Sequence, residues 1–176
     1  MKIFCGAIAA IALVLTPLSI FAGNLPSTQT YTIPLKEGVT LQMSVAPFRS
    51  REHRITRCEM FAETMPEHDS VVCLIDGKPV FGTDWEMPYN QLVKATLTVG
   101  GKTIDLDVSC MYNPFYDKPD STRFSVEKAD DLYIITGTFS DAAGSYDAQW
   151  LIIENGSVRT RLTSRLLKNS GFLVIL

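Results

Sequence analysis

The stretch that decides the fold is QLVKATLTVGGKTIDLDVSCMYNPFYDKPDST, residues 91–122. Apolar and polar residues alternate on both sides of Gly100-Gly101. A Gly-Gly pair is a strong signal for a two-residue hairpin turn, because both glycines can adopt positive φ. Counting outward from that turn gives two strands with one apolar and one polar face. Val99 and Lys102 flank the turn; the predicted apolar pairs are Leu97–Ile104, Ala95–Leu106 and Val93–Val108, and the polar pairs are Thr98–Thr103, Thr96–Asp105 and Lys94–Asp107.

Directly after this hairpin comes a segment with little sign of regular structure, MYNPFYDKPDST, residues 111–122. Loops of this length are uncommon in compact domains and are often functional. Two interpretations stay open at this point. The loop either folds its aromatic side chains back onto the sheet, or it presents them to a binding partner.

Period-2 alternation and turn signals recur along the rest of the chain, with almost no helical periodicity. A two-residue turn is expected at Asp76-Gly77 and another at Asn155-Gly156, the second of which sets Trp150 opposite Arg161. Strands are predicted at residues 30–35, 39–45, 55–61, 70–75, 78–81, 123–128, 131–139, 145–153 and 157–164, beside the two hairpin arms, with a last apolar strand at 172–176. This pattern predicts an all-β domain, an antiparallel β-sandwich or an open barrel of about ten short strands.

The N-terminus, MKIFCGAIAAIALVLTPLSIFAG, predicts a secretory signal peptide over residues 1–22, cleaved after Ala22. A single all-β domain is then expected over residues 23–176, secreted and not anchored in a membrane after cleavage. Loss of Lys2 takes the formal charge of the chain from -3 to -4. This mild acidity argues against nucleic-acid binding, which requires a basic patch, and is compatible with a basic protein partner.

Three cysteines remain after removal of the signal peptide. In an oxidising compartment, Cys58 and Cys73 are the expected disulfide, because they lie close in sequence on predicted neighbouring segments. A loop of that span would contribute about 3 kcal/mol. Cys110 is left over and falls on the inward side of its strand, which is typical of a small buried apolar residue. The odd count leaves other pairings open.

The sequence contains no convincing catalytic or metal-binding constellation. Its two histidines, His53 and His68, lie in polar loops, where solvated side chains are the usual case. A cysteine nucleophile assembled from Cys110 and a histidine is disfavoured by the inward direction of Cys110. No phosphate-binding glycine loop is present. We therefore expect a binding protein that is not an enzyme and that holds no metal or cofactor.

Three short motifs, LDVSCMYNP (106–114), IDGKPVFGTD (75–84) and GTFSDAAGSY (137–146), resemble immunity proteins of type VI secretion systems. The similarity is to the periplasmic inhibitors of cell-wall amidase effectors. The resemblance implies a partner that is a secreted peptidoglycan-cleaving cysteine amidase, blocked by a loop that enters its active site. Ser109 matches the small hydroxyl residue that reaches the catalytic pair of such an effector.

The partner-binding residues expected from this resemblance are Ser109, Cys110, Met111, Tyr112, Asn113, Phe115 and Tyr116. Independent physical arguments agree with a binding loop: a rigid hairpin carries it, and Met, Tyr and Phe are common anchors at interface centres. The loop around residues 84–90, with Trp85, is the second choice. The alternative function is a non-catalytic envelope module that binds a glycan or lipid in a cleft lined by these aromatic residues.

Overall fold

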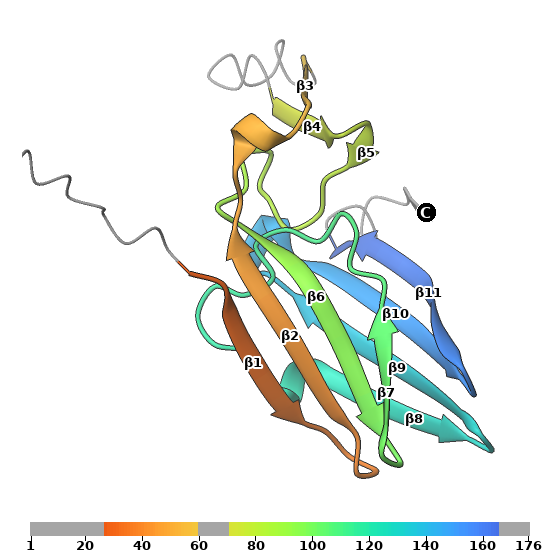
Figure 1. Ribbon diagram of the computed structural model, residues 1–176. Helices are drawn as coiled ribbons and strands as arrows, with labels where there is room; N and C mark the ends of the chain where they lie inside the picture. The colour runs from red at the N-terminus through yellow and green to blue at the C-terminus, as the bar shows by residue number, and fades with distance from the viewer. Residues whose placement is uncertain (1–26, 60–70, 166–176) are drawn as a thin grey trace, which may run out of the picture.

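The computed structural model describes residues 27–59 and 71–165, and in this part of the chain eleven strands form three antiparallel sheets (Figure 1). The first sheet has the order β1-β2-β6-β7, the second β11-β10-β9-β8, and the small third sheet β3-β4-β5. The strands are β1 (Gln29–Pro34), β2 (Thr40–Pro47), β3 (Ile55–Cys58), β4 (Val71–Ile75), β5 (Lys78–Pro79), β6 (Asn90–Val99), β7 (Lys102–Leu106), β8 (Phe124–Ala129), β9 (Leu132–Phe139), β10 (Tyr146–Ile153) and β11 (Gly156–Ser164). The short 3₁₀ helices are η1 (Ser50–Glu52), η3 (Ser121–Arg123) and η4 (Ala142–Gly144).

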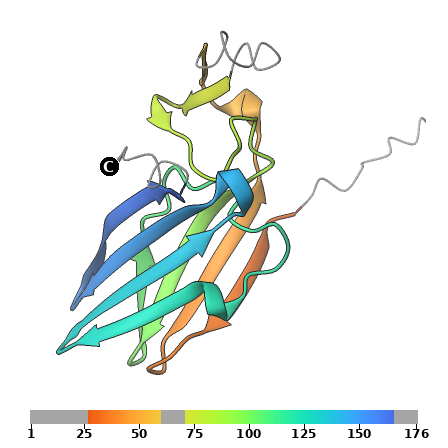
Figure 2. The same cartoon turned by 180° about the vertical axis from the view of Figure 1, so that it is seen from behind.

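The two four-stranded sheets lie face to face, and the small third sheet sits at one end of them (Figures 1 and 2). The predicted all-β class is confirmed, and because none of the sheets closes into a barrel, the architecture is the sandwich. Most of the buried side chains lie between the two large sheets. The largest of them are Trp150, Tyr146 and Phe139, each at most 1% exposed.

The predicted β6–β7 hairpin is confirmed from Val99–Lys102 through Ala95–Leu106. Its polar face also forms as expected, with the hydroxyls of Thr98 and Thr103 at 3.1 Å. The prediction fails beyond Ala95, because β7 ends at Leu106. A β-bulge where β6 pairs with β2 places Leu92 inside and leaves Val93 46% exposed. The expected pairs Val93–Val108 and Lys94–Asp107 are therefore wrong.

The predicted register of β10 and β11 is also wrong by one position at the turn. Ile153 pairs with Gly156, so the turn residues are Glu154 and Asn155. Trp150 consequently faces Arg159 instead of Arg161, and a bulge between Gln149 and Trp150 then shifts the rest of the ladder. This register brings Arg159 to the edge where β11 lies next to β7. There Arg159 contacts the connection between β7 and β8, which is described below.

The disulfide between Cys58 and Cys73 is present, as predicted, and it joins β3 to β4 in the small sheet. The same sheet is held to η1 by His53, whose Nδ1 lies 2.7 Å from a carboxylate oxygen of Asp76 and whose ring stacks on Phe48. The disulfide and this contact hold the small sheet together, and Tyr112 packs against its residues Val72 and Ile75. The predicted signal peptide, the loop with His68 and the predicted strand at 172–176 lie outside the described residues. Within residues 27–59 and 71–165, no helix is long and apolar enough to cross a membrane.

Candidate functional site

Three connections meet at the end of the sandwich that carries the small sheet: the β5–β6 link, the β7–β8 link and the β9–β10 link. Phe81 and Met111 form an isolated parallel bridge, and the Tyr112 amide donates to the Phe81 carbonyl at 2.9 Å. The Ser140 amide donates to the Pro114 carbonyl at 2.8 Å. Thus the three links are bonded to one another by their backbones. Each of the motifs quoted from the sequence contributes one of them.

The first half of the β7–β8 link is fixed to the second sheet by Arg159. Its guanidinium donates to the Ser109 carbonyl at 2.6 Å and to the Ser109 hydroxyl at 3.1 Å, and lies 3.1 Å from the Asp107 carboxylate. The Trp150 indole donates to the Asp107 carbonyl at 2.8 Å. The Ser109 hydroxyl is therefore already engaged within the molecule. The sequence did not reveal this clamp, because it depends on the corrected register of β11.

Met111 and Tyr112 are core residues, at 1% and 8% exposure. Met111 belongs to the main core, and Tyr112 packs with Val72 and Ile75 under the small sheet. Burial raises the pKa of Tyr112 to about 12. Neither side chain is presented to a partner, so the exposure that a binding anchor requires is absent at Met111 and Tyr112. Of the two interpretations that the sequence left open, this half of the link follows the first, in which the loop folds its side chains back onto the sheet.

Cys110 is a free, half-buried thiol in a positive-φ conformation (68°). Desolvation raises its pKa above the usual value, although the nearby charges of Arg159 and Lys78 act in the opposite direction. A nucleophilic cysteine requires a lowered pKa. Among the described residues, moreover, no group of three or more potential metal ligands occurs. The raised pKa disfavours the reactive thiolate form of Cys110.

The second half of the β7–β8 link turns outward at Asn113. The Asn113 side-chain oxygen accepts hydrogen bonds from the backbone amides of Tyr89 and Asn90, at 2.9 and 3.0 Å. The backbone amide of Asn113 donates to the Asn90 carbonyl at 2.9 Å. Phe115 is partly buried against Tyr31 and Phe139. Tyr116 is 87% exposed. Asn113 therefore joins the two links and holds the backbone at Tyr89.

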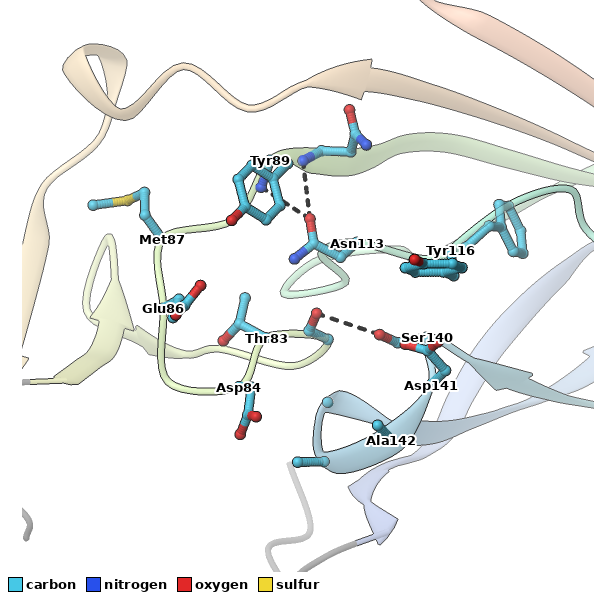
Figure 3. Close-up of a pocket in the computed structure, with 15 residues that line it drawn as sticks. Thr83, Asp84, Glu86, Met87, Tyr89, Asn113, Tyr116, Ser140, Asp141 and Ala142 are labelled. Carbon is cyan, nitrogen blue, oxygen red and sulfur yellow. Dashed lines mark hydrogen bonds between the residues drawn. The ribbon is translucent and has the colours of Figure 1, made fainter. Parts of the chain in front are cut away.

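A groove of about 500 Å³ lies between these links (Figure 3). In the figure, Tyr89 and Tyr116 lie on either side of Asn113, while Glu86 belongs to one link and Asp141 to the facing one. Tyr89 is 72% exposed, which makes it and Tyr116 the two most exposed large apolar side chains that the structure describes. The lining residues are Gly82, Thr83, Asp84, Glu86, Met87, Tyr89, Asn90, Asn113, Phe115, Tyr116, Ser140, Asp141, Ala142, Ala143 and Gly144.

The backbone around the groove is held in conformations that are costly for most residues. Positive φ values occur at Gly82 (97°), Trp85 (64°), Asn113 (39°), Ser140 (57°) and Ala142 (43°). Non-glycine residues in this region cost of order 1–3 kcal/mol each and persist only where their surroundings fix them. Here the fixing contacts include the bonds of Asn113 and the Arg123 guanidinium, which donates to the Ser140 carbonyl at 2.6 Å. The backbone around the groove is therefore held by contacts within the chain.

The structure places the partner-binding residues expected from the sequence in three different environments. Ser109 and Cys110 line a second, smaller hollow of about 290 Å³ together with Lys78. Met111 and Tyr112 are buried, and Asn113, Phe115 and Tyr116 line the groove. The second-choice loop supplies Asp84, Glu86, Met87, Tyr89 and Asn90, whereas Trp85 is not among the lining residues. The β9–β10 link was missed; its glycine-containing SDAAG sequence was the signal available for an exposed loop.

Comparisons of the chain with family models, with curated proteins and with solved structures found no match.

Proposed function

We propose that this protein is a non-catalytic binding protein of the bacterial envelope. Its partner is a secreted cell-wall amidase, which it blocks as an immunity protein does. The groove between the β5–β6, β7–β8 and β9–β10 links is the binding surface. The observation that carries the proposal is that Tyr89 and Tyr116, 72% and 87% exposed, line a groove of about 500 Å³.

Two physical arguments support a protein partner. Tyrosine is enriched among the residues that dominate binding energy, because it supplies a large amphipathic surface with few rotatable bonds. A preformed surface also loses little conformational entropy on binding, so more of the contact energy appears as affinity. The Cys58–Cys73 disulfide is compatible with an oxidising compartment. The resemblance to immunity proteins supplies the choice of an amidase.

This proposal differs in one respect from the loop insertion that the sequence suggested. Because Met111 and Tyr112 are buried, the contact is assigned to Asn113, Phe115 and Tyr116 together with Tyr89 from the β5–β6 link. A groove bounded by two exposed tyrosines receives a protruding segment of the partner. The amidase would thus be blocked by a surface that encloses one of its loops.

The test is binding and inhibition with the product of the neighbouring gene. The two purified proteins should form a complex in size-exclusion chromatography, and the complex should no longer release fragments from peptidoglycan. A neighbouring product that neither binds nor loses activity would refute the amidase proposal.

A glycan ligand is the second candidate, and the concave shape with two exposed aromatic rings favours it. Sugar rings stack on aromatic side chains, and the groove also offers amide and carboxylate groups from Asn90, Asn113 and Glu86. Titration with soluble peptidoglycan fragments, followed by tyrosine fluorescence, separates the two functions. Saturable binding of the fragments in the absence of any protein partner would support the glycan.

A further inference from the structure

The groove carries a one-sided distribution of charge. Three of its fifteen lining residues are acids, Asp84, Glu86 and Asp141, and none is Lys, Arg or His. All three acids are solvent-exposed. Within the described part of the chain, none of these carboxylates takes part in an ion pair, whereas Asp107 and Asp147 are both paired with arginines. Among the residues that the structure describes, therefore, no cation is paired with the acids of the groove.

The aromatic side chains of the same groove favour the same kind of ligand. A guanidinium or ammonium group is attracted to the face of a tyrosine ring, and arginine also stacks flat on it. The rings of Tyr89 and Tyr116 are largely free of contacts with the protein, as their exposures of 72% and 87% indicate. A carboxylate and a ring face that are accessible together suit one cationic side chain better than they suit a neutral ligand.

The walls are held in place before any ligand arrives. Asn113 holds the chain at Tyr89 by two amide hydrogen bonds, and the Ser140 amide is bound to the Pro114 carbonyl, two residues before Tyr116. The backbone that carries the tyrosines is therefore already placed, and a cation would be met by rotation of their exposed side chains. A second copy of this chain is a poor occupant, because its formal net charge is -3 and like charges would approach each other.

We infer that the groove takes an extended, arginine-bearing segment of the partner protein, with a guanidinium placed between the tyrosine rings and the carboxylates of Glu86 and Asp141. This inference rests on the proposed function and gives the chemistry of the partner's contacting segment. Arginine is preferred over lysine, because its planar group can both stack on a ring and form two parallel hydrogen bonds to a carboxylate.

The probe is a blocked pentapeptide of sequence SRSRS, compared with SQSQS and SESES, titrated into the purified protein and followed by NMR. The arginine peptide should bind in preference to the others and shift the ring resonances of Tyr89 and Tyr116. Its affinity should fall as salt is raised, because exposed charges are screened. Equal binding of the glutamine peptide, or shifts confined to other parts of the molecule, would overturn the inference.

Two variants that remove the same charge from different places test whether the peptide binds at the acids of the groove. The triple variant Asp84→Asn, Glu86→Gln, Asp141→Asn should weaken binding of SRSRS about tenfold. The control Asp130→Asn, Asp131→Asn, Glu154→Gln removes the same charge from the turns at the opposite end of the sandwich and should leave the affinity unchanged (Figure 1). Equal losses in the two variants would mean a general charge effect and would overturn the inference.

The same variants distinguish this inference from the proposed function. If the amidase still binds the groove triple variant with full affinity but not a variant lacking both tyrosines, the groove is a protein-binding site without a cationic ligand. In that case the inference fails and the proposed function stands. If peptidoglycan fragments shift the tyrosine rings and SRSRS does not, both fail in favour of a glycan.

Discussion

Replacing Gly82 by alanine tests how the groove is held together. Gly82 has φ +97° and lies where the β5–β6 link crosses the β7–β8 link. A Cβ at this position would lie 1.8 Å from the Tyr112 carbonyl oxygen and 2.8 Å from Cε1 of Tyr146. The first contact is with backbone, which cannot rotate away. The two links must therefore separate to accept the methyl group.

The magnitude follows from two terms. The positive φ costs an alanine about 1–3 kcal/mol. Separation of the links removes the hydrogen bonds between Phe81 and Cys110 and between Tyr112 and Phe81, each worth about 1 kcal/mol. The sum is about 3–5 kcal/mol, a large part of the total stability of an ordinary domain, which is about 5–15 kcal/mol.

Urea denaturation followed by tryptophan fluorescence measures this loss. The matched control is Gly101→Ala in the β6–β7 turn, where φ is +78° and no atom lies within 4 Å of the added Cβ. The control carries only the backbone term, so Gly82→Ala should be less stable than Gly101→Ala by about 2 kcal/mol. Equal losses in the two variants would show that the close approach of the links does not exist in solution.

Three further predictions concern the disulfide, the buried tyrosine and the arginine clamp. The double variant Cys58→Ser, Cys73→Ser should lose about 3 kcal/mol of unfolding free energy in urea denaturation; a loss below about 0.5 kcal/mol would contradict a closed native disulfide. Because the folded pKa of Tyr112 is raised to about 12, its neutral phenol stabilises the fold below the unfolded value of about 10, and this contribution is lost as pH rises from about 10 to 12. Absorbance titration at alkaline pH should therefore show a phenol that ionises near pH 12 and that Tyr112→Phe removes, while the late ionisation of Tyr146, whose pKa burial also raises, remains; ionisation of all tyrosines near 10 would refute the burial. Arg159→Ala should cost about 2 kcal/mol, since it removes charge-assisted bonds to Ser109, and an unchanged thermal midpoint would count against the clamp.

The β6–β7 hairpin could be predicted because its information is local. Alternation sets the faces, and Gly100-Gly101 sets the turn, so Leu97 and Ile104 were paired from the sequence alone. The prediction stopped holding beyond Ala95, where β7 ends and a bulge at Val93 depends on how β6 pairs with β2. Strand β2 is some fifty residues earlier in the chain, and no local pattern reports its register. The β10–β11 register failed for a different, local reason, since Gly156 fits both inside the turn and just after it.

The groove was only partly predictable. Its exposed loop residues, Tyr116 and those around Tyr89, follow from long polar-aromatic segments that break the strand pattern. The burial of Met111 did not, because it depends on the bridge between Met111 and Phe81 and on the hydrogen bond that the Leu92 amide donates to the Met111 carbonyl, which join three distant segments. Side-chain types alone suggested anchors in both cases. Only the tertiary contacts show that Met111 supports the surface from inside, whereas Tyr116 forms part of it.

The claim that the groove is the binding surface is tested most directly by calorimetric titration of the neighbouring gene's product into the Tyr89→Ala, Tyr116→Ala variant. The control is Val158→Ala, a 52% exposed side chain on β11 outside the groove. If each tyrosine is an anchor worth about 2 kcal/mol, the double variant should bind at least 100-fold more weakly than wild type. Its thermal midpoint should be unchanged, and Val158→Ala should bind normally. Full affinity in a folded double variant would contradict the account.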